Sequence, residues 1–211
     1  MNGPHQDQPL ETAGPPPEDA GAAVVMVHGR GATARSILGM AREFADDVAA
    51  LAPQASGNTW YPNSFLAPVE QNEPHLSSAL RAVEDAIETA TDAGIPAERV
   101  LVLGFSQGAC LASETLARSA REYGGLAALS GGLIGDEVQR ERYEGDFAGM
   151  GAFFGCSDVD PHIPAERVHE SAAVYGDLDA DVTTRLYGGM GHGVNEDELE
   201  YVRGMVAALV E

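Results

Sequence analysis

The sequence predicts an α/β fold with a mostly parallel central sheet and helices on both of its faces. Short apolar runs rich in β-branched residues alternate along the chain with segments whose apolar residues recur at helical spacing. Such alternation is typical of a parallel sheet covered on both faces. The length of 211 residues, with 44% apolar side chains, fits one domain with its own core.

Six short apolar runs are predicted to be buried strands, because fully covered parallel strands are apolar along their whole length. They span residues 23–28, 48–53, 99–105, 125–130, 151–155 and 182–187. Most of them contain β-branched or aromatic residues, and none exceeds seven residues. That length is ordinary for a strand and short for a helix.

Helical periodicity appears between these runs, at residues 37–45, 76–90, 109–121, 165–175 and 199–209. In the second of these segments Leu76, Leu80, Val83 and Ile87 fall on one face. Asn195 is followed three residues later by Glu198, a pattern similar to a capping box, which predicts where the last helix begins.

The remaining segments set the domain limits. Residues 1–21 are rich in Pro and Gly and are predicted to be an irregular N-terminal segment, although residues 8–12 could add a short edge strand. Residues 22–211 form the predicted domain, with a long loop at 54–75. Cys110 and Cys156 belong to no metal or disulfide motif, and we expect both to be buried free thiols.

The net charge excludes some partners. There are 33 acidic residues against 12 basic ones, all of them Arg, which leaves a formal charge of −21. So large a negative field argues against nucleic acid and against insertion into an anionic membrane. No apolar run approaches the roughly 18 residues of a membrane span, and the first ten residues do not resemble a signal peptide, so we expect a cytoplasmic protein.

A motif typical of a serine nucleophile lies at the end of the predicted strand 99–105. Residues 104–108, GFSQG, match G-x-S-x-G and are followed by a predicted helix. A sharp strand-to-helix turn of this kind projects the serine above the sheet, and side chains at Gly104 or Gly108 would clash where strand and helix converge. The motif therefore predicts Ser106 as a nucleophile. The alternative is an ordinary serine in a Gly-rich turn.

A serine hydroxyl needs a base, and in this arrangement the base follows the nucleophile along the chain. The candidates are His162, His169 and His192. We predict His192, because it lies in a Gly-rich loop after the last strand run. His169 falls inside a predicted helix, and His162 is predicted to line the pocket.

The acid that orients the base is predicted in the loop 156–164, which directly follows a strand run. Asp158 and Asp160 are both available. We favour Asp160, because Pro161 restricts its backbone to extended forms. The alternative role of Asp158 is to bind backbone N–H groups of a turn.

Two backbone N–H donors are needed to hold an oxyanion. One is predicted at Gln107, directly after the nucleophile, and the other at Arg30, in the loop that follows the first strand run. The Arg30 side chain is then free to remain solvated or to bind a substrate oxygen. His28 precedes it and is expected to be structural.

The 54–75 loop contains Trp60, Tyr61, Phe65 and Leu66. Aromatic residues there would make an apolar wall for an acyl or alkyl group, although they could equally cover the core or a sheet edge. The predicted substrate-binding residues are Trp60, Phe65, Leu66, Leu133, His162 and Met190.

Together these segments resemble the phospholipase/carboxylesterase family of the α/β-hydrolase superfamily, which includes the acyl-protein thioesterases. The matching pieces are VVMVHGRGA at 24–32, APQASGNTWYP at 52–62, RVLVLGFSQGA at 99–109, ALSGGL at 128–133, SDVDPHIP at 157–164 and GGMGHGVNEDE at 188–198. The resemblance implies a Ser106–Asp160–His192 triad in an α/β-hydrolase fold without a large cap domain. It implies no metal and no organic cofactor, and it alone makes a homodimer plausible. The thioesterase branch usually carries Leu where this chain has Arg30, which favours the general esterase branch.

The sequence thus predicts a serine carboxylic-ester hydrolase that acts through an acyl-enzyme on small or medium apolar esters. A thioesterase or lysophospholipase with the same triad remains open. So does a binding protein that keeps the pocket without the chemistry. A metal-dependent hydrolase would instead use Asp158, Asp160, His162 and His192 as ligands.

The acidic surface without Lys predicts a halophilic protein, the alternative being an ordinary solvated face. Salt at 1 M shortens the Debye length to about 3 Å and screens the self-repulsion of the acidic groups. We therefore expect the melting temperature to rise between low and molar KCl. A melting temperature that stays level or falls over that range would contradict the prediction.

Overall fold

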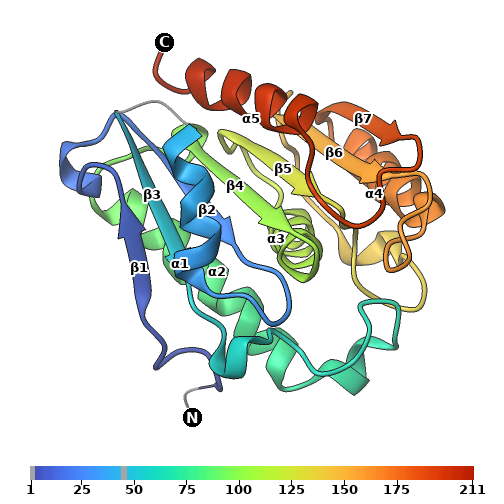
Figure 1. Ribbon diagram of the computed structural model, residues 1–211. Helices are drawn as coiled ribbons and strands as arrows, with labels where there is room; N and C mark the ends of the chain where they lie inside the picture. The colour runs from blue at the N-terminus through green and yellow to red at the C-terminus, as the bar shows by residue number, and fades with distance from the viewer. Residues whose placement is uncertain (1–2, 44–46) are drawn as a thin grey trace.

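The computed structural model describes residues 3–43 and 47–211. Seven strands form one sheet in the order β1-β3-β2-β4-β5-β6-β7 (Figure 1). The strands are β1 Leu10–Ala13, β2 Ala22–Val27, β3 Val48–Pro53, β4 Val100–Phe105, β5 Gly125–Leu129, β6 Gly151–Ser157 and β7 Asp181–Tyr187. All neighbouring strands are parallel except β1, which runs antiparallel to β3. The six predicted strands and the mostly parallel sheet are confirmed.

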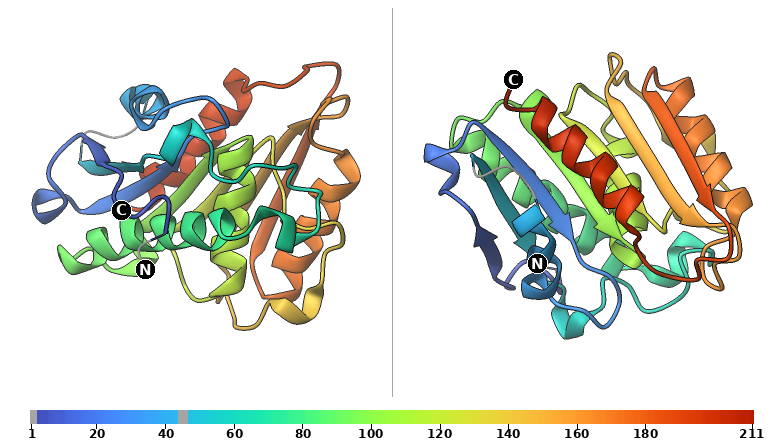
Figure 2. Two further views of the ribbon diagram at one scale, coloured as in Figure 1. Left: turned by 90° about the horizontal axis from the view of Figure 1, so that it is seen from below. Right: turned by 45° about the horizontal axis from the view of Figure 1, so that its top comes forward.

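Helices lie on both faces of this sheet, as predicted (Figures 1 and 2). They are α1 Ala34–Ile37, α2 His75–Asp92, α3 Gln107–Arg118, α4 Ala165–Asp177 and α5 Glu196–Ala208. Helices α2, α3 and α4 cover one face, and α1 and α5 cover the other. In the described ranges, no helix combines the length and apolar character that a membrane crossing requires.

The core has two layers because side chains alternate along each strand. In β2, Val25 and Val27 pack toward the α2–α4 side, whereas Val24 and Met26 pack toward α1 and α5. All four side chains are fully buried. This two-sided burial explains why the strand is apolar at every position.

The predicted helix at 37–45 is wrong in its limits. The structure has α1 at Ala34–Ile37 followed by a 3₁₀ helix at Leu38–Glu43, and residues 44 and 45 of the prediction lie outside the described residues. The helix begins early because the Thr33 side chain accepts a hydrogen bond from the Ser36 N–H, at 3.2 Å, and caps it.

The N-terminal segment is more ordered than the irregular prediction for 1–21, and residues 1 and 2 lie outside the described part. The edge strand expected as an alternative is present at Leu10–Ala13, paired with β3, and a 3₁₀ helix follows at Pro17–Asp19. Before it, His5 is 2% exposed, and its Nε2–H donates to the Trp60 carbonyl at 2.8 Å. The strand exists because β3 would otherwise leave an unpaired edge.

Candidate active site

Ser106 sits in a strained turn between β4 and α3. Its backbone has φ 55° and ψ −121°, a conformation that residues other than glycine rarely adopt. A Cβ at Gly104 would lie 2.3 Å from the Gly108 carbonyl oxygen, and one at Gly108 would lie 2.1 Å from the Val27 carbonyl oxygen. Both positions therefore require glycine, as the motif predicts.

The structure brings the three predicted triad residues together from three loops. His192 Nε2 lies 2.8 Å from the Ser106 Oγ, and His192 Nδ1 lies 2.7 Å from Asp160 Oδ2. Asp160 follows β6, and His192 lies between β7 and α5, so the groups meet at the carboxyl ends of parallel strands. Ligands of open α/β sheets bind at this edge.

Asp160 is buried and held from two sides. Its side chain is 0% exposed, and its Oδ1 accepts hydrogen bonds from the backbone N–H groups of His162 and Ile163 at 2.8 and 3.1 Å. Burial alone would raise the pKa of this carboxyl, but the hydrogen bonds from His192 and these N–H groups outweigh it and lower the pKa. The carboxylate is therefore ionised and fixed in direction beside His192.

The other Asp and His residues considered in the sequence analysis do not join this hydrogen-bonded set. Asp158 is exposed, and its Oδ1 accepts the Gly189 N–H at 2.8 Å, which fits the backbone-binding role considered for it. His169 is exposed on α4, away from the groove lining. His28 is fully buried against Trp60, with ring centroids 5.0 Å apart, and is structural as expected.

The two residues predicted to form the oxyanion hole lie near Ser106. A Cβ at Gly29 would be 3.3 Å from the Ser106 Cβ, so the loop carrying Arg30 passes close to Ser106. Gln107 is the first residue of α3, where N–H groups have no acceptor within the helix. Both residues line the groove that contains Ser106 and His192.

That groove has a volume of about 490 Å³. It is lined by Arg30, Tyr61, Pro62, Asn63, Ser64, Phe65, Ser106, Gln107, Cys110, His162, Ile163 and His192. Of the predicted substrate-binding residues, Phe65 and His162 are among them. The His162 ring stands edge-on to the His192 ring, with centroids 4.9 Å apart.

The other four predicted substrate-binding residues do not line the groove. Trp60 and Leu133 are fully buried in the core, and the Trp60 Nε1–H donates to the His28 carbonyl at 2.8 Å. Leu66 packs against the edge of the same core, and Met190 Sδ accepts a hydrogen bond from the Asn195 amide. For Trp60 the core-covering alternative is the correct one, because a large apolar ring gains more from full burial than from a groove wall.

Cys110 and Ile163 are groove residues that the prediction missed. Cys110 lies three residues after Gln107 in α3, so the two share one face of the helix, a spacing that could have indicated its position. Both cysteines are free and buried, as expected. Burial raises the pKa of the Cys110 thiol to about 12, so it remains protonated and does not compete as a nucleophile.

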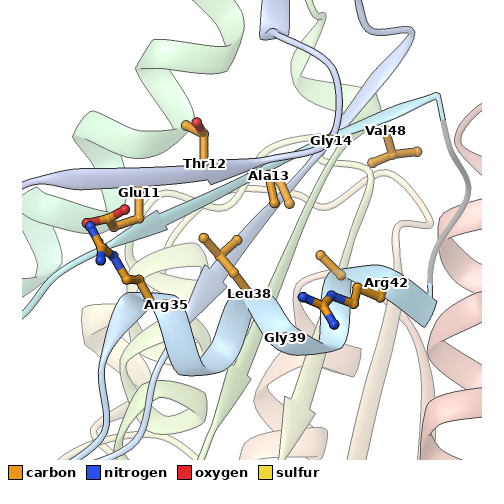
Figure 3. Close-up of a pocket in the computed structure, with 11 residues that line it drawn as sticks. Glu11, Thr12, Ala13, Gly14, Arg35, Leu38, Gly39, Arg42 and Val48 are labelled. Carbon is orange, nitrogen blue, oxygen red and sulfur yellow. The ribbon is translucent and has the colours of Figure 1, made fainter.

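A second hollow of similar size, about 480 Å³, lies between the edge strand β1 and the α1 segment (Figure 3). The Arg35 guanidinium reaches Glu11 there, with an N–O distance of 3.2 Å. It contains no residue of the predicted triad.

The structure also bears on the metal-dependent alternative. Across residues 3–43 and 47–211, no three or more His, Cys, Asp or Glu side chains are grouped so that they could hold a metal ion. The metal-dependent alternative therefore has no ligand set in that part of the chain.

The sheet order, the turn at Ser106 and the helices on both faces define an α/β-hydrolase fold. The chain belongs to the phospholipase/carboxylesterase family, whose model matches residues 12–210. A solved structure of a phospholipase/carboxylesterase from Dyadobacter fermentans has 43% sequence identity to it and a TM-score of 0.92, covering 95% of this chain and 97% of that one.

Two more distant proteins are also similar to this chain. Acyl-protein thioesterase 1 of Saccharomyces cerevisiae is 30% identical over 125 residues, which are 58% of this chain and 55% of the relative. The matched stretch thus spans about half the length of that curated relative. Arabidopsis thaliana SOBER1 shares the fold, with a TM-score of 0.74 at 18% identity over 90% of this chain and 99% of that one.

Glu198 is a buried carboxyl behind the His192 loop. It is 0% exposed, and its Oε2 accepts the Asn195 N–H at 2.8 Å in the predicted capping box. Its Oε1 has no hydrogen-bond partner within the described part of the chain. Burial raises the pKa of Glu198 to about 7, although the Asn195 hydrogen bond partly opposes this rise.

Replacing Glu198 with Gln should therefore change how stability depends on pH. The folded protein keeps the Glu198 proton up to a pH of about 7, whereas an unfolded chain releases it near 4.3, so the wild type loses stability as pH rises through this window. Relative to Glu198→Gln, the loss should be on the order of 1–3 kcal/mol. Urea unfolding of both proteins between pH 4.5 and 8 measures it.

The matched control is Glu200→Gln, an exposed position on the same helix, which should follow the wild type at every pH. A free-energy difference between wild type and Glu198→Gln that stays constant across the pH range would contradict the assignment.

Proposed function

We propose that the protein is a serine carboxylic-ester hydrolase that acts through an acyl-enzyme on small or medium apolar esters. The observation that carries the proposal is the continuous hydrogen-bonded path from Asp160 through His192 to the Ser106 hydroxyl, with distances of 2.7 and 2.8 Å. The path opens into a groove that has apolar side chains along it. A nucleophile, a base and an orienting acid in this relation define acyl transfer chemistry.

In the first half of the reaction, neutral His192 accepts the hydroxyl proton of Ser106 at Nε2 while the Oγ attacks the acyl carbon. The Nδ1–H of His192 donates to Asp160, which fixes the tautomer and stabilises the imidazolium as it forms. The N–H groups of Arg30 and Gln107 hold the oxyanion. His192 then protonates the leaving alcohol, and the acyl group stays on Ser106.

In the second half, His192 takes a proton from water, and the resulting hydroxide attacks the acyl-enzyme. The Ser106 ester bond breaks, and the proton returns to the serine oxygen. The products are a carboxylic acid and the free enzyme. These residues complete the scheme without a metal or an organic cofactor.

The second candidate is thioester hydrolysis with the same triad, and the 30% identity to the yeast acyl-protein thioesterase 1 favours it. The scheme is the same except that the leaving group is a thiol. A lysophospholipase would also use these steps with a larger leaving group, and a non-catalytic binding protein would use none of them. Hydrolysis rates for an oxygen ester and a thioester of the same acyl group distinguish the first two.

Replacing Ser106 with Ala should lower kcat by about a thousandfold or more, because the nucleophile is lost while the fold is kept. The measurement is hydrolysis of p-nitrophenyl esters with acyl chains of two to twelve carbons, in 2–3 M KCl. The wild-type profile across the series then reports the acyl length that the groove accepts.

The control is the circular dichroism spectrum and melting temperature of Ser106→Ala in the same salt, which should match a folded protein. Turnover close to that of the wild type in the folded variant would refute the scheme. A folded wild type without activity on any ester or thioester would favour the binding protein.

A further inference from the structure

Two residues, Arg30 and Gln107, supply the backbone N–H groups of the proposed oxyanion hole. Their side chains share one hydrogen-bond acceptor, the carbonyl oxygen of Tyr61. Arg30 Nη2 and Gln107 Nε2 both donate to it, each at 2.9 Å. These two residues come from separate loops, one after β2 and one at the start of α3. A single backbone oxygen therefore connects them.

Arg30 holds more of the same segment. Its Nη1 donates to the Pro62 carbonyl at 3.0 Å, and its Nη2 also donates to the Asn63 carbonyl at 2.7 Å. Among the residues that the structure describes, no carboxylate pairs with this guanidinium, unlike that of Arg35 or Arg81. The interactions that locate the Arg30 side chain are thus three consecutive carbonyls, which neither the solvated nor the substrate-binding expectation included.

Gln107 holds the segment from the other side. Its side chain is nearly buried, and its Oε1 accepts the Trp60 N–H at 3.0 Å while its Nε2 serves Tyr61. The oxygen and the nitrogen of the side-chain amide therefore both form hydrogen bonds, to two consecutive residues of the 58–63 segment. A buried amide satisfied at both ends has one orientation.

A backbone hydrogen bond also joins the loop after β2 to this segment. The Gly31 N–H donates to the Asn58 carbonyl at 2.7 Å, so the loop after β2 is joined to the 58–63 segment by its backbone as well as by Arg30. That segment is also one wall of the groove, through Tyr61, Pro62 and Asn63.

We propose that the side chains of Arg30 and Gln107 are positioning residues that fix the distance between the two oxyanion-hole N–H groups by bonding to the Tyr61 carbonyl. This inference rests on the proposed function, because it assigns a role within that reaction. An oxyanion hole works only when both donors lie at hydrogen-bond distance from the developing charge, and small displacements are costly. The same bonds keep the groove wall in register with Ser106.

Arg30→Met removes the three hydrogen bonds that the guanidinium donates and keeps most of the aliphatic stem. We expect kcat on p-nitrophenyl butyrate to fall by about 10- to 100-fold while KM changes by less than about threefold, because the oxyanion forms only after binding. Arg30→Lys should recover part of the loss, since an ammonium can still donate to these carbonyls. The inhibition constant of a trifluoromethyl ketone, which forms an oxyanion on the enzyme, should rise by the same factor as kcat/KM falls.

Gln107→Met should likewise lower kcat and raise the inhibition constant of the trifluoromethyl ketone, with little change in KM. The double variant should lose little beyond the worse single variant, because both side chains act through one carbonyl and their effects are not additive. Arg81→Met is the matched control. Arg81 lies exposed on α2 and pairs with Asp85 at 2.9 Å, and its replacement should leave kcat and KM unchanged.

Three results would overturn the proposal. They are a kcat of folded Arg30→Met within about twofold of the wild type, a loss confined to KM, and losses that multiply in the double variant. Failure of the proposed function looks different, because it appears as an inactive wild type or an active Ser106→Ala.

Discussion

The site depends on the close approach of β4, α3 and β2 around one turn. Ser106 can face the groove only because its backbone is held at positive φ, and this turn fits only because two glycines let the neighbouring main chains come near. The strain is local, and the buried β4 and α3 on either side stabilise it. Any other residue at Gly108 would push the helix away from β2, and with it both Ser106 and Gln107.

The other two residues of the proposed triad lie on loops that are joined to one another as well as to the sheet. The Ser157 Oγ accepts the Gly191 N–H at 3.1 Å, and Asp158 accepts the Gly189 N–H. The His192 loop is thus anchored to the end of β6 and to the loop that follows it, by contacts that involve neither the His192 nor the Asp160 side chain. Such support holds the imidazole in place before a substrate arrives, which is how an active site avoids reorganisation during the reaction.

Much of this architecture can be predicted from the sequence because its signals are local. Buried parallel strands are apolar at nearly every position, so they can be identified from the sequence alone. The turn at Ser106 needs glycine at two fixed positions, so its motif can be identified in the same way. The preference for Asp160 over Asp158 also agrees with the geometry, since only Asp160 lies beside His192.

Roles that depend on distant partners were not predictable. Trp60 is an aromatic residue in a loop, and its place in the core depends on packing against residues distant in the sequence, among them His5 and His28. The sequence leaves the role of the Arg30 side chain open, and the positioning role proposed for it rests on three carbonyls about thirty residues away that no periodicity reveals. The edge strand at Leu10–Ala13 was predicted only as an alternative, because its pairing depends on the free edge of β3, which is a property of the assembled sheet.

Reaction with a fluorophosphonate, followed by mass spectrometry of the digested protein, tests the central claim that Ser106 is a nucleophile activated by His192. In this reaction the serine oxygen forms a bond to phosphorus and fluoride leaves. The account predicts one phosphonyl group per chain, on the peptide that contains Ser106, and a much slower reaction in His192→Ala. An unmodified folded protein, or a phosphonyl group on another residue, would contradict it.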